Sequence, residues 1–577
     1  MTDPVFPGSS AEGTQSAAEV LLRSLKASGI DHMFVNPGTD FAPLVEGLAA
    51  SKRKKADIPQ LMVIPHENCA VSMAHGYYMV AGKPQAVMVH TNVGTANTIN
   101  CMADAYRDNV PILLMAGRTP ITEQGVLGSR NSPVHWGQEM FDQAGMLREF
   151  VKWDYEMKLP MQAEDLVSRA LEVMMTAPRG SAYLTLPREA LGGTVPASNR
   201  PMMARAHPSM AYPNPAAIAT LTGMVEAAER PLIITSASGR TNQAVEALAR
   251  LTERFAIPVV SFNARYVCLP SSHPMNMGSV PKPFLSEADL VIILDSDAPW
   301  FPSQESPPAG CKVVQIGDDP AFTRYPMRGF QCDLSITAET TAALTVLDEA
   351  LGEKGLDKGA KVETRRNRLG ERWKAMRAQW KATLDKAATE PSIKIEYLNH
   401  CLGEAVGPDA LIVNEYWVRT EFCKREKAGT LYGSGPAGGL GWGVGAALGA
   451  KLAAPDKLVV CTVGDGAYMF ANPTACHWTA QAHNLPILTV INNNAVYNAV
   501  RRSTLAMYAT GLAQAENDGH TLADLNPSPA FEKLVEASGG YGERVEKPAD
   551  LPAALARAIK VVREEKRQAV LNVIVTL

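Results

Sequence analysis

Short runs of apolar, strand-forming residues alternate with helical stretches along this chain, and that alternation constrains the fold most. The first runs are HMFV at 32–35, LMVI at 61–64, AVMVH at 86–90 and PILLMAG at 111–117. Apolar runs of this kind are typical of strands buried on both faces, and the helices between them supply the crossovers that parallel strands need. The pattern predicts an α/β fold built on doubly wound parallel sheets.

Two segments of different composition divide the chain, whose 577 residues exceed what one hydrophobic core usually organises. Pro and Ser crowd residues 196–215, as in a linker, and residues 353–386 are strongly charged. We expect the charged segment to be a solvated helical connector, with a partner-binding surface as the alternative. Strand–helix alternation resumes after each segment. We therefore predict three α/β domains, at 1–195, 215–350 and 390–577.

Composition excludes several classes of protein. The 55 Lys and Arg against 59 Asp and Glu give a net charge of −4, which offers no electrostatic case for nucleic acid. Nine scattered cysteines without a C-x-x-C pair indicate buried thiols in a reducing compartment, not a disulfide framework or a zinc site. The first residues do not resemble a secretion signal, and no apolar run approaches the ~20 residues that span a bilayer. We expect a cytoplasmic enzyme that binds no nucleic acid and no membrane.

Polar residues follow the predicted strands of the third block, at the edge where ligands bind in open parallel sheets. The Gly-Asp-Gly triplet 464–466 follows LVVCTV, and the Asn triplet 492–494 follows PILTVI. One Asp and one Asn can present oxygens to Mg²⁺, which prefers such ligands together with phosphate oxygens. Glycines here and in the upstream segment 433–441 let the backbone approach a diphosphate. The set predicts a site for a magnesium-bound diphosphate.

In the first block, Thr39 and Asp40 follow the first predicted strand, Glu67 follows the second, and His90 ends the third. Each of these features also has a purely structural interpretation. In that interpretation Glu67 caps a helix, His90 is a structural histidine, and the Gly and Asn triplets are turns. Their order and spacing within one chain favour a functional site.

That order and spacing resemble the thiamine-diphosphate-dependent enzymes along nearly the whole chain. The triplet 464–466 with Asn493-Asn494 resembles their diphosphate signature, Pro65-His66-Glu67 resembles the segment of their catalytic glutamate, and residues 94–97 resemble the Gly-x-x-Asn loop that follows. The resemblance implies a pyrimidine-binding, a middle and a diphosphate-binding domain, with thiamine diphosphate and Mg²⁺ as cofactors. Within the family the chain is most similar to benzoylformate decarboxylases, through residues 36–39, His90, 436–441 and 497–501.

The resemblance also implies site residues. Asp465, Asn494 and the Val496 carbonyl would bind Mg²⁺, with Asn493 as the alternative to Asn494, and Leu440 would be the apolar wedge that bends the cofactor. The implied catalytic residues are Glu67, His90 and Thr39. The implied cofactor-binding residues are Glu67, Gly438, Leu440, Gly464, Asp465, Gly466, Asn494 and Tyr497.

By the same resemblance, Glu67 would favour the imino tautomer of the cofactor's aminopyrimidine, and His90 would relay protons. The reaction implied is decarboxylation of a 2-oxo acid, ligation of the resulting enamine to an aldehyde, or both. In the resembling enzymes the glutamate and the Mg-diphosphate come from different subunits. A homodimer at least, and a homotetramer by preference, is therefore expected.

Three alternative functions are also considered for this chain. An acetohydroxyacid synthase-type transferase often holds FAD in its middle domain, and Gln138-Glu139 resembles a pair found there. We see no flavin motif in 215–350, and whether a nucleotide or flavin binds there stays open. A nicotinamide dehydrogenase is disfavoured because the turn 235–240 lacks the glycine fingerprint. A non-catalytic relative is disfavoured by the retained Glu67 and Asp465. The acyl donor, the acceptor and the main reaction also stay open.

Overall fold

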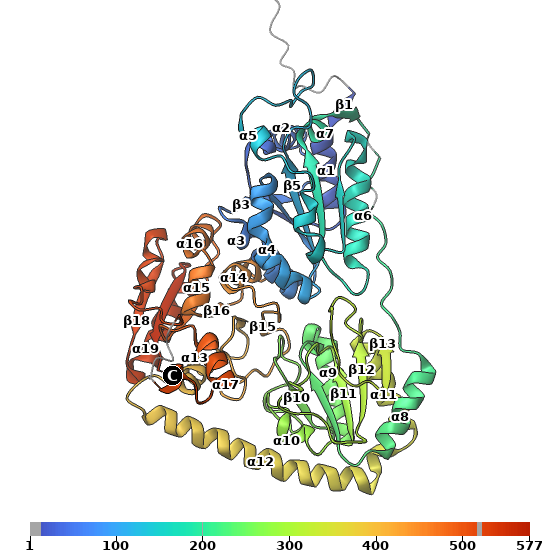
Figure 1. Ribbon diagram of the computed structural model, residues 1–577, viewed down its shortest axis with the longest axis vertical. Coiled ribbons are helices and arrows are strands. Elements are labelled where there is room, and N and C mark those ends of the chain that lie inside the picture. Colours follow the sequence, from blue (N-terminus) through green and yellow to red (C-terminus); the bar gives the residue numbers. More distant parts are fainter. Residues whose placement is uncertain (1–12, 199, 203, 516–521, 577) are drawn as a thin grey trace, which may run out of the picture.

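The computed structural model describes residues 13–198, 200–202, 204–515 and 522–576, which three parallel sheets organise (Figure 1). The strand order of the first sheet is β3-β2-β4-β5-β7-β6. Its strands are β2 (His32–Asn36), β3 (Gln60–Val63), β4 (Gln85–Val89), β5 (Ile112–Arg118), β6 (Trp153–Glu156) and β7 (Ala182–Pro187). Its main helices are α1 (Ala17–Ala27), α3 (Glu67–Ala81), α4 (Thr91–Arg107) and α6 (Ala163–Met175).

Both faces of the first sheet are buried, as its apolar strands require. On β4, Val87 and Val89 pack in one cluster with α3 and α4 residues, whereas Ala86 and Met88 pack in another with α1 and α6 residues. Successive side chains of a strand point to opposite faces, so an uninterrupted apolar run serves two cores at once. A short antiparallel pair, β1 (Thr14–Ser16) with β8 (Thr194–Pro196), joins the two ends of this part of the chain.

The second sheet has the order β10-β9-β11-β12-β13. Its strands are β9 (Pro231–Thr235), β10 (Val259–Ser261), β11 (Leu290–Leu294), β12 (Lys312–Gly317) and β13 (Leu334–Thr337). Helices α8 (Pro215–Ala227), α9 (Asn242–Phe255) and α11 (Thr340–Glu353) connect and cover them.

The third sheet has the order β15-β14-β16-β17-β19-β18. Its strands are β14 (Leu411–Asn414), β15 (Leu431–Gly433), β16 (Val459–Gly464), β17 (Leu488–Asn493), β18 (Tyr541–Val545) and β19 (Ala569–Ile574). Helices α13 (Ile395–Val406), α14 (Trp442–Ala453), α16 (Pro473–Ala482) and α19 (Leu551–Arg563) pack on it. All registered strand pairs of the three sheets are parallel, which confirms the predicted fold class.

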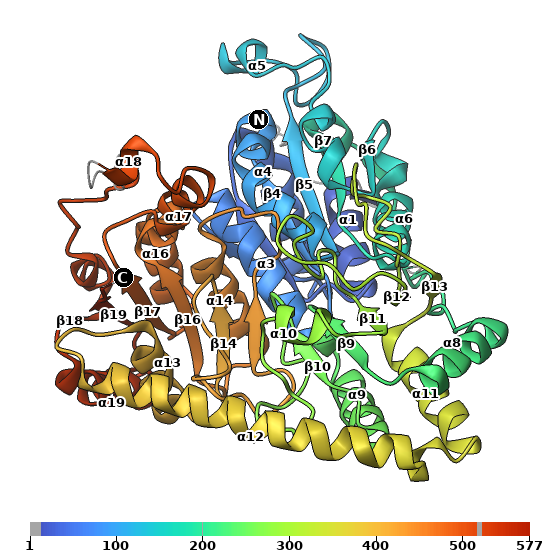
Figure 2. The same ribbon diagram turned by 60° about the horizontal axis from the view of Figure 1, so that its bottom comes forward.

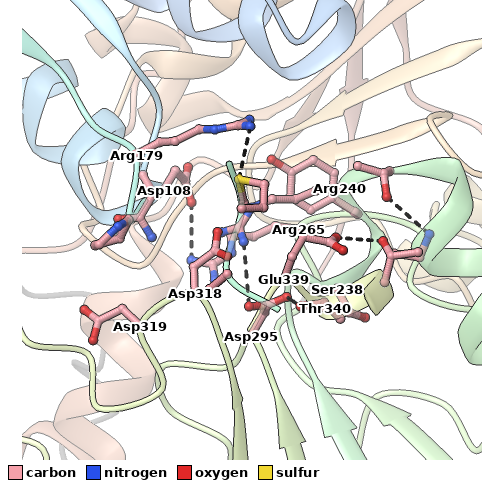
Figure 3. Close-up of a pocket in the computed structure, with 18 of the residues that line it drawn as sticks. Asp108, Arg179, Ser238, Arg240, Arg265, Asp295, Asp318, Asp319, Glu339 and Thr340 are labelled. Carbon is pink, nitrogen blue, oxygen red and sulfur yellow. Dashed lines mark hydrogen bonds and ion pairs between the residues drawn. The ribbon is translucent and has the colours of Figure 1, made fainter. Parts of the chain in front are cut away.

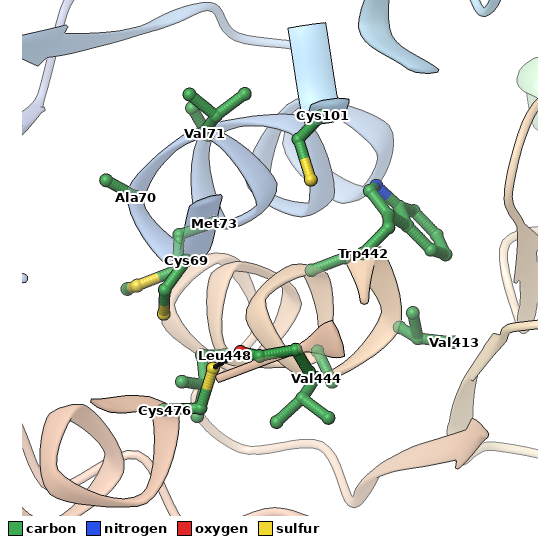
Figure 4. Packing of buried hydrophobic residues seen from close by; sticks show 14 of the residues in the cluster. Cys69, Ala70, Val71, Met73, Cys101, Val413, Trp442, Val444, Leu448 and Cys476 are labelled. Carbon is green, nitrogen blue, oxygen red and sulfur yellow. Dashed lines mark hydrogen bonds between the residues drawn. The ribbon is translucent and has the colours of Figure 1, made fainter. Parts of the chain in front are cut away.

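The first and third domains share a hydrophobic core through α3 and α14, which lie against each other (Figure 4). Small residues make this possible. A Cβ at Gly76 would overlap the Ala446 carbonyl, and a Cβ at Gly449 would overlap the Met73 carbonyl. Trp442, at the start of α14, is fully buried in the shared cluster. The segments before α3 and before α14, where the predicted site residues lie, are therefore fixed relative to each other.

The charged segment forms a single long helix, α12 (Ala360–Thr389), which runs beneath the middle and third domains (Figure 2). It is less solvated than predicted at its start, because Val362, Arg365 and Leu369 are buried. Arg365 donates to the Phe255 carbonyl at 2.6 Å. The connector is thus attached to the middle domain by one helical face.

All nine cysteines are free thiols, and eight of them are buried, whereas Cys332 is exposed. In the parts of the chain that the structure describes, we find no helix with the length and apolarity needed to cross a bilayer.

Candidate active site

His90 lies at the carboxyl edge of the first sheet, between β4 and α4. Its Nδ1 is 2.5 Å from Oδ1 of Asp40, a residue that is 4% exposed, and its Nε2 is 3.2 Å from Nε2 of Gln138. The Asp40 hydrogen bond raises the pKa of His90 and outweighs the opposing effect of burial. With Nδ1 engaged by the carboxylate, Nε2 is the nitrogen that can exchange a proton with a ligand.

Two glycines make room for this pair. A Cβ at Gly38 would overlap the His90 ring, and a Cβ at Gly117, on β5, would overlap the Asp40 carboxylate. Thr39 follows Gly38 as the first residue of a short 3₁₀ helix, η1 (Thr39–Phe41), and is exposed. The predicted Thr39 therefore stands next to the backbone that packs on His90.

Glu67 begins α3 at the same edge of the sheet and is 6% exposed. Its Oε2 accepts a hydrogen bond from Asn97 Nδ2 at 3.1 Å. A Cβ at Gly94 would come within 3.1 Å of Oε1, so this glycine leaves the other oxygen uncrowded. Glu67 also contributes to the raised pKa of His90. The structure thus brings Thr39, Glu67 and His90 to one edge of the first sheet.

Asp465 occupies the corresponding edge of the third sheet. It begins α15 (Asp465–Phe470) directly after β16 and is 4% exposed. Its Oδ1 accepts from the Gly466 N–H at 2.8 Å, whereas its buried Oδ2 has no hydrogen-bond partner among the described residues. Burial raises the pKa of this carboxyl, against the effect of the N–H groups of Gly466, Ala495 and Asn494. A buried carboxylate oxygen without a partner is suited to a cation.

The two candidate asparagines differ in their hydrogen bonds. Asn493 is buried, and its Nδ2 donates at 2.9 Å to both Ser528 Oγ and Asn572 Oδ1. Asn494, just beyond β17, is half-buried, and its Oδ1 accepts from the Val496 N–H at 3.0 Å. These hydrogen bonds hold the Asn493 side chain within the third domain, so the geometry favours Asn494 as the candidate Mg²⁺ ligand.

Tyr497 connects the Gly-Asp-Gly turn to this asparagine turn. It directly precedes α17 (Asn498–Met507), and its ring lies so close to Gly466 that a Cβ there would overlap Cε1. The Val496 carbonyl accepts from the Asn498 N–H at 2.8 Å and retains a second lone pair. Asp465, Asn494 and Val496 therefore belong to one small region.

Leu440 lies in the tight turn that leads into α14. The turn has left-handed backbone at Gly438 (φ +73°) and Gly441 (φ +88°), and Leu440 itself is half-buried. A Cβ at Gly441 would overlap the backbone of Phe470 and Ala471, at the end of α15. The predicted wedge thus lies beside the helix that Asp465 begins.

The predicted residues fall into two groups. Thr39, Glu67 and His90 lie on the first sheet, and the remaining ones lie on the third. A contact between His66 Nδ1 and Asn472 Nδ2, at 3.5 Å, joins the two sides. The unpartnered oxygen of Asp465 and the open space around Gly464, where a Cβ would meet nothing within 4 Å, fit a magnesium-bound diphosphate on the third sheet.

Apart from these residues, a cavity of about 580 Å³ lies between the first and middle domains, beyond the carboxyl ends of the middle sheet (Figure 3). Arg240 faces Asp295 across 3.9 Å, and Thr340 donates to Asp295 at 2.5 Å. Burial and the neighbouring Asp295 raise the pKa of Asp318 to about 6. This is the position at which open α/β sheets bind ligands, although the turn 235–240 carries no glycine fingerprint.

Comparison with known protein families decides the identity. The family models for thiamine pyrophosphate enzymes match in order: the N-terminal TPP-binding domain at residues 15–146, the central domain at 218–347 and the C-terminal TPP-binding domain at 415–573. Together they cover most of the chain. The chain is a thiamine-diphosphate enzyme. Its cofactor is thiamine diphosphate, and Mg²⁺ is the usual partner metal in this family. The predicted family and cofactors are confirmed.

The relatives of this thiamine-diphosphate enzyme have more than one activity. A probable acetolactate synthase of Mycobacterium bovis is 27% identical over 559 residues, covering 94% of each chain. A probable 2-ketoarginine decarboxylase of Pseudomonas aeruginosa is 26% identical over 558 residues, covering 93% of this chain and 90% of the relative.

Solved structures share the fold. Benzoylformate decarboxylase from Polynucleobacter necessarius superimposes with a TM-score of 0.77 at 19% identity, covering 97% of this chain and 99% of that one. A 4-hydroxybenzoylformate decarboxylase from Rhodococcus jostii gives a TM-score of 0.74 at 20% identity, with the same coverage.

Sequence reasoning assigned no role to several residues that contact the site. Asp40 was adjacent to the predicted Thr39, and Asn97 lay within the predicted Gly-x-x-Asn loop, so both were within reach of the motif argument. Gln138 was noted only for its resemblance to a Gln-Glu pair of acetohydroxyacid synthases, and it comes from a long segment after β5 whose path no periodicity reveals. Its contact with His90 depends on how distant segments pack in the folded chain, which the sequence does not reveal.

Proposed function

We propose that this enzyme decarboxylates a 2-oxo acid and then releases the aldehyde or joins the remaining acyl unit to an aldehyde acceptor. The observation that supports this most is His90, held by Asp40 at the same sheet edge as Glu67. A half-buried histidine whose Nε2 meets, among the residues that the structure describes, only the displaceable Gln138 side chain suits a reaction that moves a proton onto and off a substrate oxygen. Thiamine diphosphate, when bound, supplies the carbon nucleophile and the electron sink for loss of CO₂.

Glu67 would hold a proton shared with a ring nitrogen of the cofactor's aminopyrimidine. Its buried carboxylate has one oxygen bonded to Asn97 and one uncrowded oxygen. A charge-assisted hydrogen bond in such a dry site is stronger than in water. This role precedes any contact with substrate.

His90 Nε2 would exchange a proton with the substrate oxygen, while Asp40 fixes the ring orientation and stabilises the imidazolium form. Gln138 would orient the same nitrogen until a ligand displaces it. Thr39, exposed beside Gly38, would contact the substrate carboxylate or the adduct oxygen through its hydroxyl.

On the third sheet, Asp465, Asn494 and the Val496 carbonyl would bind Mg²⁺, and Gly464 and Gly466 would allow the diphosphate close to the backbone. Gly438 and Leu440 would shape the cofactor, and Tyr497 would close the site by packing on Gly466. Of these, the unpartnered Oδ2 of Asp465 is the strongest support.

We further propose that Glu67 and Asp465 of different chains complete each site, so that the working unit is a homodimer at least and a homotetramer by preference. The support for this is the family resemblance, since in the resembling enzymes these two groups come from different subunits. A cytoplasmic location fits the free, mostly buried thiols.

A panel of 2-oxo acids, aromatic and aliphatic, tests the proposed activity. The purified protein, supplied with thiamine diphosphate and Mg²⁺, is assayed for CO₂ release with and without an acceptor aldehyde. CO₂ release that depends on the cofactor supports the proposal, and its absence across the panel contradicts it. Product analysis separates aldehyde release from carboligation.

A second candidate is an acetohydroxyacid synthase-type transferase. The acetolactate synthase relatives and the 580 Å³ cavity at the edge of the middle sheet favour it. The absorption spectrum of the protein as purified distinguishes the two. Flavin released on denaturation favours the transferase, whereas thiamine diphosphate without flavin favours the decarboxylase.

A further inference from the structure

The turn that carries Leu440 is held by side chains from two domains. Asn100 Nδ2, on α4 of the first domain, donates to the Leu440 carbonyl at 2.9 Å. On either side of Leu440, the N–H groups of Gly439 and Gly441 donate to buried carboxyl groups, those of Asp104 at 3.0 Å and Glu415 at 2.8 Å. Three backbone groups of the turn, one in Leu440 and one on each side of it, are thus bonded to side chains.

Asp104 reaches the turn from α4. It is fully buried, and burial raises its pKa to about 8, although the Gly439 N–H opposes the effect. Its Oδ2 has no hydrogen-bond partner within the described ranges. A Cβ at Gly439 would lie 2.5 Å from that oxygen, so only glycine allows the approach. Asp104 therefore carries a proton at neutral pH, and its Oδ1 remains an acceptor for the turn.

Glu415 reaches the turn from the end of β14, in the third domain. It is also fully buried, and each of its oxygens accepts a main-chain hydrogen bond, from Gly441 at 2.8 Å and from Gly443 at 2.7 Å. Burial raises its pKa to about 7, against the effect of the N–H groups of Gly443, Gly441 and Trp442. Both oxygens are needed as acceptors, which an amide side chain cannot reproduce.

One face of α4 connects this arrangement to Glu67. Asn97, Asn100 and Asp104 are spaced by three and four residues and so lie along one side of the helix. Asn97 bonds to Glu67, and the other two bond to the turn. Burying two carboxyl groups is costly, and apolar residues would pack the same space at lower cost. Their hydrogen bonds to the half-buried turn indicate a role in its geometry.

We propose that Asp104, Glu415 and Asn100 are positioning residues that set the place of Leu440 relative to the bound cofactor. This inference rests on the proposed role of Leu440 as the wedge. The side chains act on the cofactor only through the backbone of the turn. Loss of any of them lets Leu440 shift, and the reactive carbon then exchanges its proton more slowly.

The test measures two properties of the protein loaded with thiamine diphosphate and Mg²⁺. One is the dissociation constant of the cofactor. The other is the rate at which the cofactor's reactive carbon, the thiazolium C2, exchanges its proton, which is followed by NMR in deuterated solvent. Asp104→Ala and Glu415→Ala should each slow exchange about 10- to 100-fold, the range for losing a bond to a buried group. Asn100→Ala, at an exposed position, should slow it about 3- to 10-fold. Leu440→Ala should give the same kind of defect directly.

The conservative variants separate positioning from packing. Asp104→Asn keeps an acceptor for Gly439 and should retain exchange within about threefold, whereas Glu415→Gln places an NH₂ group against a main-chain N–H and should be as slow as Glu415→Ala. Thr98→Val, which removes a buried hydroxyl that donates to the Thr95 carbonyl within α4, is the matched control and should exchange normally.

Normal exchange in both Asn100→Ala and Glu415→Gln, in folded protein that binds the cofactor, would overturn the inference. If the alanine variants of the carboxyl groups do not fold, Asn100→Ala and the Asn and Gln variants decide alone. Failure of the wild-type protein to bind the cofactor would instead count against the proposed function, so the two failures are distinguishable.

Discussion

Asp40→Asn is the perturbation that best probes how the fold prepares His90. The Asp40 and His90 side chains are 3% and 21% exposed, and their atoms lie 2.5 Å apart. A hydrogen bond between charged groups contributes about 1.5–3 kcal/mol, and the exposure of His90 reduces this to about 1 kcal/mol. The amide still accepts from Nδ1 but no longer stabilises the imidazolium. An activation barrier raised by about 1 kcal/mol corresponds to a roughly fivefold lower kcat.

The pH dependence of Asp40→Asn has a defined sign. Because Asp40 raises the pKa of His90, its loss moves that pKa downward, and the limb of the kcat/KM profile that His90 controls moves to lower pH. The pair's contribution to stability is fully present below the ordinary histidine pKa of 6.5 and is lost as pH rises through the raised value. The variant should therefore lose about 1 kcal/mol of unfolding free energy in acid and less in base.

Two measurements check this prediction. One is the pH profile of kcat/KM for CO₂ release, and the other is the NMR titration of the His90 imidazole in both proteins. Gln138→Ala is a useful comparison because it contacts Nε2 and leaves the Asp40 bond intact. A pH profile and a His90 titration that are both unchanged by Asp40→Asn would refute the reasoning.

Three further outcomes follow from the same geometry. Asp465→Ala should abolish retention of thiamine diphosphate with little loss of fold, and dialysed variant protein that binds it as tightly as wild type would contradict the assignment. Mixing Glu67→Gln and Asp465→Ala chains should regenerate activity if sites are shared between subunits; verified hybrids without any activity would argue against sharing. Gly117→Ala should cost about 1–3 kcal/mol of stability, because its Cβ would overlap the buried Asp40 carboxylate, and an unchanged melting temperature would show that the overlap is relieved elsewhere.

Much of the fold could be predicted because its parallel strands are buried on both faces. Uninterrupted runs such as those on β4 and β16 have few other stable arrangements, and the polar residues after them fall at the ligand-binding edge by necessity. That is why Glu67, His90 and Asp465 could be expected at the sheet edges, although their proposed roles came from the family resemblance. The charged segment was predicted to be helical, but the burial of Arg365 under the middle domain was not, since it depends on which neighbour the helix meets.

The finer site depends on tertiary contacts between distant segments. Asp104 and Glu415 lie 311 positions apart, and no motif links them before the first and third domains pack through α3 and α14. The proposal of Asn494 over Asn493 as the ligand likewise needed the partners of Asn493, which are Ser528 and Asn572 from other segments. Sequence spacing indicates which residues approach a sheet edge, and packing decides which of them are free to bind.

The most direct test of the central claim is C2-proton exchange of bound thiamine diphosphate in Glu67→Gln and His90→Ala, with turnover measured on the same samples. Glu67 acts on the cofactor before substrate arrives, so Glu67→Gln should slow exchange by an amount equivalent to ~2–4 kcal/mol in the barrier. His90 acts only on the adduct, so His90→Ala should exchange normally and turn over roughly 10²–10⁴-fold more slowly. Slow exchange in His90→Ala, or normal exchange in Glu67→Gln, would contradict the account.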